Sequence, residues 1–216
     1  MTPEIFLFDL DGTLVDSAPD LAGAANHLRL IRNLSPVPYD KLKVTASSGA
    51  RGLIKAAFDM DSDSPGYDEI VNEFLDYYQD HLADNSCLFK GVPELLKWFD
   101  DNSIVWGIVT NKHERFTFPL IKALNIHPHV VVCGDTLSER KPSPLPLLYA
   151  AQKVGKDITK GIYCGDDKRD ITAANAAHCF SIAAQWGYLG ETYPIEDWGA
   201  KLIMRNPSEL IHFQLP

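Results

Sequence analysis

The sequence predicts an α/β protein: a doubly wound parallel sheet with an α-helical cap inserted after the first strand. Three observations lead to this prediction. Residues 4–9 form an apolar run that is typical of a buried strand. Residues 16–85 then show helical spacing and no convincing strand. From residue 91 onward, strand-like and helical runs alternate, as they do in βαβ units of a parallel sheet.

The helical segment begins with clear local signals. Asp16–Pro19 offers a capping residue and an early proline, so a helix is expected to run on to Ile31. Further helices are expected over 49–58 and 67–82, where apolar residues recur at helical spacing. We therefore predict a catalytic core of residues 1–15 and 86–216 and a cap domain of residues 16–85.

The second part of the chain supplies the rest of the sheet and its covering helices. Strands are expected at 104–110, 130–133, 161–164, 180–184 and 202–204. Helices are expected between them at 93–99, 114–124, 144–154 and 171–177. After the first strand, no further strand is expected until well beyond residue 85. Residues 16–85 are therefore read as an insertion between the first strand and the rest of the sheet.

Composition limits the classes of function. The net charge is −9, which argues against nucleic acid and anionic membrane surfaces as partners. No apolar run is long enough to span a bilayer, and no charged-then-apolar leader is visible, so a cytoplasmic protein is expected. The cysteines show no paired spacing, which predicts free thiols, mostly buried, in a reducing compartment. The oligomeric state stays open.

Polar and charged residues follow four of the predicted strands. They are Asp9 and Asp11, then Thr110, Asn111 and Lys112, then Lys141, and finally Asp166 and Asp170. In doubly wound sheets, ligands bind at the carboxyl ends of the strands. Taken alone, the paired acids followed by Gly-Thr are as typical of a solvated turn as of a catalytic site. The recurrence of polar residues after several strands, at one edge of the sheet, favours a binding or catalytic site.

These residue types suit phosphoryl transfer, which needs positioning and neutralised oxygens. Asp9 can attack phosphorus, and Asp11 can protonate the leaving alkoxide. Asp166 supplies a carboxylate for Mg²⁺, and Asp170 could hold a water of that metal. Lys141 supplies the cation that lets a carboxylate approach a phosphate. Thr110 and its neighbouring N–H groups could donate to phosphate oxygens.

The four pieces, in this order, resemble the haloacid dehalogenase superfamily of phosphatases. The matching segments are Asp9–Thr13, Thr110–Asn111, Lys141–Pro142 and Gly165–Asp170. The resemblance implies a Rossmann-like core with a helical cap. It also implies that Asp9 forms an aspartyl-phosphate and that Asp11 is the general acid and base. Mg²⁺ would be held by the Asp9 side chain, the Asp11 backbone carbonyl and Asp166.

Within the superfamily the chain is similar to phosphatases of 2-phosphoglycolate. The similar segments are Asp9–Pro19, Val109–Lys112 and Lys141–Leu148. Three further segments resemble phosphatases of N-acetylmuramic acid 6-phosphate: Ser48–Arg51, Val105–Lys112 and Asp197–Ala200. Two residues depart from the larger group: Asp167 stands where a small residue is frequent, and His113 where proline is frequent.

A second set of residues would bind substrate: Thr13, Asn111 and Lys112 in the core, and Ser48, Gly49 and Arg51 in the cap. Lys112 would face the phosphate or only water. Arg51 would clamp a substrate carboxylate, a group that suits the fork of a guanidinium. The alternative is a solvated arginine at a helix start.

We therefore expect a Mg²⁺-dependent phosphomonoesterase that acts on a small phosphorylated metabolite bearing a carboxylate. One alternative is a phosphomutase that uses the same aspartyl-phosphate but keeps the phosphoryl group from water. Another is a receiver-like signalling module phosphorylated on aspartate. A receiver module has its paired acids after an early strand, whereas the acids here are split between the first strand and a late one. A receiver fold also has no place for the helical insertion.

Overall fold

The protein is built on a six-stranded parallel sheet with the strand order β5-β4-β1-β6-β7-β8. The computed structural model describes residues 2–190 and 193–216; residues 1 and 191–192, which fall in the predicted core, lie outside this description. The strands are β1 (Phe6–Phe8), β4 (Trp106–Val109), β5 (Val130–Val132), β6 (Ile162–Gly165), β7 (Phe180–Ala184) and β8 (Leu202–Met204). Since β1 pairs with both β4 and β6, its carboxyl end lies where the strand order reverses, the usual place for a ligand.

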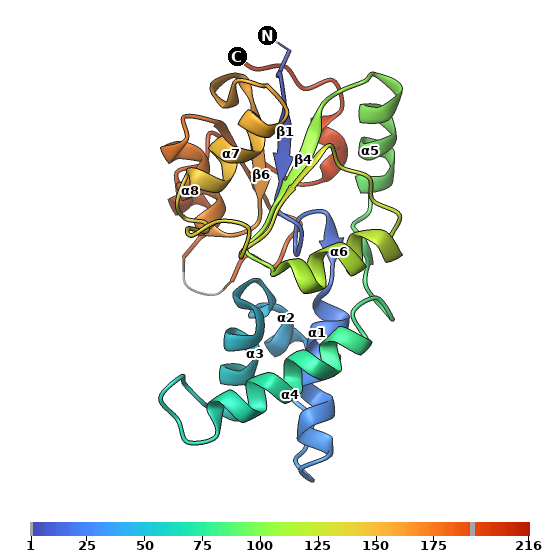
Figure 1. Ribbon diagram of the computed structural model, residues 1–216, viewed down its shortest axis with the longest axis vertical. Coiled ribbons are helices and arrows are strands. Elements are labelled where there is room, and N and C mark those ends of the chain that lie inside the picture. Colours follow the sequence, from blue (N-terminus) through green and yellow to red (C-terminus); the bar gives the residue numbers. More distant parts are fainter. Residues whose placement is uncertain (1, 191–192) are drawn as a thin grey trace.

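Helices cover both faces of the sheet (Figure 1). They are α5 (Val92–Asp101), α6 (Glu114–Ala123), α7 (Leu145–Lys153) and α8 (Lys168–Ala176). Side chains of β1 alternate between two apolar clusters, with Phe6 and Phe8 packed among residues of α5 and α6, and Leu7 among residues of α7 and α8. This arrangement confirms the predicted α/β fold, and every predicted strand is present within two residues at each end.

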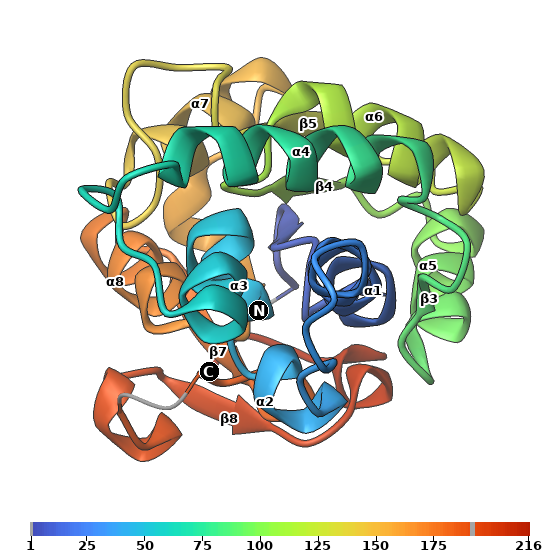
Figure 2. The same ribbon diagram turned by 90° about the horizontal axis from the view of Figure 1, so that it is seen from below.

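Residues 16–85, which we call the helical insertion, lie together beyond the carboxyl ends of the strands (Figure 1). Their helices are α1 (Ala18–Leu30), α2 (Tyr39–Lys43), α3 (Gly49–Phe58) and α4 (Tyr67–Asp80). The short α2 and a 3-10 turn at Ala46–Ser48 were not predicted, since neither is long enough to show a helical period. In the view from below, α1 and α3 lie beside each other and α4 crosses past both (Figure 2).

The chain enters and leaves the helical insertion through two paired segments. β2 (Val15–Asp16) and β3 (Cys87–Leu88) run antiparallel to each other. Beside this pair, the buried carboxylate of Asp20 accepts hydrogen bonds from the backbone and side chains of Asn85 and Ser86, at 2.6–3.1 Å. The start of α1 is thereby tied to the segment that returns to the sheet.

Two sequence expectations can be compared with the described residues. All four cysteines are free thiols; Cys133, Cys164 and Cys179 are buried and Cys87 is exposed. Among the described residues, no helix is both long enough and apolar enough to cross a bilayer.

Candidate active site

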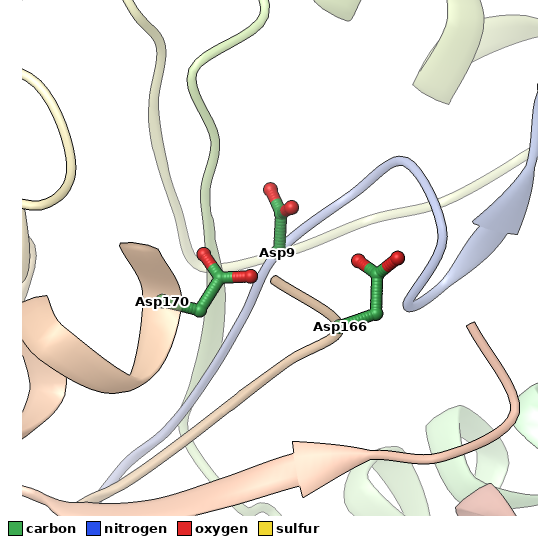
Figure 3. Close-up of side chains that lie close together, drawn as sticks. All are labelled: Asp9, Asp166 and Asp170. Atoms are coloured by element: carbon green, nitrogen blue, oxygen red, sulfur yellow. The ribbon is translucent and has the colours of Figure 1, made fainter. Parts of the chain in front are cut away.

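Three carboxylates meet at the carboxyl ends of β1 and β6. Asp9 follows β1, Asp166 follows β6, and Asp170 lies in the first turn of α8 (Figure 3). One oxygen from each lies within 4.8 Å of the others. Asp166 and Asp170 are buried, whereas 13% of the Asp9 side chain is exposed. Asp9 is therefore the member of the cluster that a molecule from solution can reach.

The loop after β1 passes very close to this cluster, and two glycines make that possible. Gly12 has φ +83°, and a Cβ there would lie 2.2 Å from an oxygen of Asp166. A Cβ at Gly187 would lie 2.2 Å from the Cβ of Asp166. Any side chain at either position would displace the Asp166 carboxylate.

Lys141 is the cation of the site. Its Nζ lies 2.9 Å from Asp9 Oδ1 and 2.7 Å from Asp170 Oδ1, and only 2% of its side chain is exposed. It also donates to the Tyr163 hydroxyl at 2.8 Å, and that hydroxyl donates to the Val109 carbonyl at 2.7 Å. Lys141 is thus held from two sides against the predicted nucleophile.

Burial and the charges of the site together explain its pKa shifts. Burial, and then the charges of Asp9 and Asp170, raise the pKa of Asp166 well above its ordinary value. Burial also raises the pKa of Asp170, although Lys141 opposes this. Burial alone would lower the pKa of Lys141, but Asp170 and Asp9 outweigh it, so the pKa is raised and the lysine stays charged. The cluster holds more negative charge than one lysine offsets.

Asp11 lies apart from the three-carboxylate cluster and has its own partners. Lys112 Nζ lies 3.1 and 3.2 Å from its two carboxylate oxygens. The hydroxyl of Ser17 donates to the same carboxylate. Lys112 also lies 2.8 Å from the hydroxyl of Tyr78 in α4. Lys112 therefore contacts the predicted general acid, and its role toward substrate stays a prediction.

The remaining core residues predicted to bind substrate lie at the same edge. The Thr13 hydroxyl donates to Asp166 Oδ1 at 3.2 Å. Thr110 is buried directly after β4, and its hydroxyl accepts from the backbone N–H of Lys112. Asn111 donates from its side chain to the Lys141 carbonyl at 2.9 Å. The structure brings all three to the edge of the sheet where the cluster lies, while their contact with substrate stays a prediction.

The helical insertion reaches the cluster through Ser47. Its hydroxyl donates to Asp166 Oδ2 at 3.2 Å, and its carbonyl accepts from Arg169 at 2.7 Å. Ser48 and Arg51, which were predicted to bind substrate, are exposed near this contact at the start of α3, and Gly49 is half-buried there. The turn that carries the predicted specificity residues thus lies over the carboxylates.

Both departures from the family pattern have local partners. Asp167 caps α8 by accepting from the Arg169 N–H at 2.8 Å, and its carboxylate also pairs with the Arg169 side chain. This pair positions Arg169 for its bond to Ser47. His113 begins α6, is exposed, and lies 3.4 Å from the Asp135 carboxylate.

Residues that contact the site and that sequence reasoning missed include Ser17, Ser47, Tyr78, Tyr163 and Arg169. Tyr78 and Tyr163 lie inside apolar patterns of a helix and a strand, where a tyrosine is expected to be part of the core. Arg169 stands at a helix start, where a solvated charge is ordinary. The one available signal was the position of Ser47 beside the predicted Ser48–Arg51 segment.

Comparisons with known proteins agree with this geometry. A model of the family described as haloacid dehalogenase-like hydrolase matches residues 6–184. The chain is 39% identical to N-acetylmuramic acid 6-phosphate phosphatase of Pseudomonas aeruginosa over 95% of this chain and 92% of that protein. It is 41% identical to phosphoglycolate phosphatase of Xanthomonas campestris over 96% of this chain and 95% of the other.

A solved structure gives the same picture of the fold. The crystal structure of a predicted phosphoglycolate phosphatase from Haemophilus somnus superposes with a TM-score of 0.86 and 27% identity. The superposition covers 98% of this chain and 97% of that one. The helical insertion and the sheet therefore occur together in a solved relative.

Proposed function

Because the chain belongs to the haloacid dehalogenase-like hydrolases and is a phosphatase of that family, we propose that it hydrolyses a small, carboxylate-bearing phosphate monoester through an aspartyl-phosphate. The observation that carries this proposal is the placement of Lys141 between Asp9 and Asp170 at the edge of a buried carboxylate cluster. A lysine in that place offsets the negative charge of the Asp9 carboxylate and draws a phosphate toward it.

The residues divide the chemistry between them. Asp9 attacks phosphorus, forms the aspartyl-phosphate and releases the alkoxide of the substrate. Asp11 gives its proton to that alkoxide and later takes a proton from the water that hydrolyses the intermediate. Thr110, Asn111 and Lys141 hold the phosphate oxygens during both steps.

The donor set fits a magnesium ion. The cluster consists of carboxylate oxygens, the ligands Mg²⁺ prefers. Lys141 pairs with Asp9 and Asp170, and no ion pair among the described residues reaches Asp166. We assign the ion to Asp9, the Asp11 backbone carbonyl and Asp166, with Asp170 beside it. When bound, the ion neutralises phosphate charge as the two anions meet.

The substrate class rests on relatives and on the helical insertion. The relatives' names point to N-acetylmuramic acid 6-phosphate and 2-phosphoglycolate, and both molecules carry a carboxylate. We assign that carboxylate to Arg51 and the neighbouring Ser48 and Gly49, because their turn lies over the cluster through Ser47. The helical insertion would serve as a cap that excludes bulk water. The Ser48–Arg51 and Asp197–Ala200 resemblances favour the amino-sugar phosphate.

A screen of phosphorylated metabolites tests the proposal. With Mg²⁺, the purified protein should release inorganic phosphate from one of the two candidate substrates, and its kcat/KM for that substrate should be the highest in the panel. Asp9→Asn, which keeps the shape of the side chain, should lose several orders of magnitude. Conversion of a sugar phosphate to its isomer without phosphate release would identify a phosphomutase and overturn the proposal, as would near-normal turnover by a folded Asp9→Asn protein.

A further inference from the structure

The side chain of Tyr78 connects the helical insertion to the predicted general acid. Its hydroxyl lies 2.8 Å from Lys112 Nζ, and the same ammonium lies 3.1 and 3.2 Å from the two oxygens of Asp11. All three groups are well shielded: Tyr78 is 2% exposed, and the side chains of Lys112 and Asp11 are 8% and 15% exposed. The chain of contacts runs from α4 through the loop after β4 to the loop after β1.

Packing alone does not explain the hydroxyl of Tyr78. Its ring lies 5.5 Å from the ring of Phe116 in α6 and 6.3 Å from that of Phe74, one turn earlier in α4. Phe74 fills its own place on this face with no hydroxyl. A phenylalanine at position 78 would make the same ring contacts, so the oxygen serves the polar contact with Lys112.

The direction of the contacts suggests what the hydroxyl does. Lys112 is a long, flexible side chain, and a single contact to Asp11 would leave it several rotamers. Because its Nζ contacts both the Tyr78 hydroxyl and the Asp11 carboxylate, Lys112 fixes the orientation of that carboxylate.

We propose that Tyr78 is a positioning residue that, through Lys112, aims Asp11 at the leaving-group oxygen when α4 lies against the core. In the view from below, α4 crosses in front of β4 and beside α6 (Figure 2). Tyr78 of α4 contacts Lys112 in the loop after β4. An insertion that moved away from the core would take the hydroxyl with it and release Lys112. The inference rests on the proposed role of Asp11 as general acid.

A series of para-substituted phenyl phosphates tests this inference. The kcat/KM of this enzyme reports only the steps up to leaving-group departure, and a positioned acid matters more as the leaving group becomes more basic. For Tyr78→Phe we expect about a tenfold loss on phenyl phosphate, the size of one lost hydrogen bond to a charged group, and little loss on p-nitrophenyl phosphate. The plot of log kcat/KM against leaving-group pKa should become steeper.

Two variants make the result specific. Tyr77→Phe changes the neighbouring tyrosine, which stacks between His27 and His81, and should leave the plot unchanged. In the Lys112→Met background, Tyr78→Phe should have no further effect, because its partner is gone. Thermal unfolding of each variant checks that the fold is intact.

The outcomes separate the inference from the proposed function. If Asp11→Asn steepens the plot and Tyr78→Phe does not, the positioning role of Tyr78 is wrong and the general acid stands. An equal loss from Tyr78→Phe on all substrates also overturns the inference, because it indicates general support of the fold. If Asp11→Asn itself leaves the slope unchanged, the proposed role of Asp11 fails.

Discussion

Lys141 and Asp170 form an ion pair of 2.7 Å in which both side chains are at most 2% exposed. Breaking such a pair from one side leaves an uncompensated buried charge, which costs about 3–5 kcal/mol. We expect Lys141→Met to lower the free energy of unfolding in urea by this order and to abolish phosphate release. Adding Asp170→Asn should restore part of the stability but none of the activity. If the Lys141→Met protein is as stable as the natural protein, the ion pair does not make the proposed contribution to the free energy of unfolding.

Asp166 should make the metal-free protein less stable as the pH rises. Burial and the charges of Asp9 and Asp170 raise its pKa in the folded state above its value near 4 in the unfolded chain. A raised carboxyl pKa contributes stability that is present below the unfolded pKa and is lost as the pH rises through the folded pKa. Asp166→Asn cannot ionise, so it should be more stable than the natural protein at about pH 8 and no more stable at about pH 4.

Urea unfolding in the presence of chelator measures that difference. Added Mg²⁺ should then stabilise the natural protein and leave Asp166→Asn nearly unchanged, because the variant lacks a charged ligand. A stability difference independent of pH would contradict the assigned cause.

Activity should depend on the identity of the divalent cation. Chelation should remove phosphate release, Mg²⁺ should restore it, and Ca²⁺ should inhibit it, because calcium takes more ligands at longer distances and would engage the nucleophile with both oxygens. Asp166→Ala should raise the Mg²⁺ concentration for half-activation more than Asp170→Ala does. Undiminished activity after exhaustive chelation would rule out the metal site.

Arg51 should affect substrate choice without affecting the reaction itself. If it clamps a carboxylate, Arg51→Ala lowers kcat/KM for the natural substrate by about one to two orders of magnitude. p-Nitrophenyl phosphate, which has no carboxylate, should change little. Lys55→Ala is the matched control, because Lys55 lies one turn further along α3 and pairs with Asp59 and Asp61 at 2.8 Å. Equal losses on both substrates would mean that Arg51 supports the fold.

Asp20 should be important for stability although it lies outside the active site. Its buried carboxylate accepts from both Asn85 and Ser86, and removing it leaves the backbone N–H of the buried Ser86 without this acceptor. We expect Asp20→Ala to lower the free energy of unfolding by about 3 kcal/mol. Asp40→Ala, which removes an exposed acid in α2, should have little effect. A urea titration compares the two, and equal stabilities would refute the assignment.

The sequence was most informative where residue spacing follows from regular structure. The apolar run ending at Asp9 predicted β1, and the polar residues after later strands predicted the edge at which Lys141 and Asp170 meet. What it did not reveal were contacts between segments far apart in the chain. Tyr78 and Lys112 are 34 residues apart and neither motif nor period links them. The hydrogen bonds of Asp20 likewise depend on where the chain returns to the core at Asn85 and Ser86, and the local sequence pattern carries no information about that position.

The pairing of β2 with β3 has a consequence for the modularity of the protein. The chain departs from the core and comes back at adjacent antiparallel positions, so the two ends of the helical insertion are no further apart than the arms of a hairpin. A module of almost any length can be spliced between such ends without shifting the strands. If the helical insertion selects the substrate, as we propose, substrate specificity could be exchanged between phosphatases by replacing this one segment, provided that the replacement also contacts Lys112.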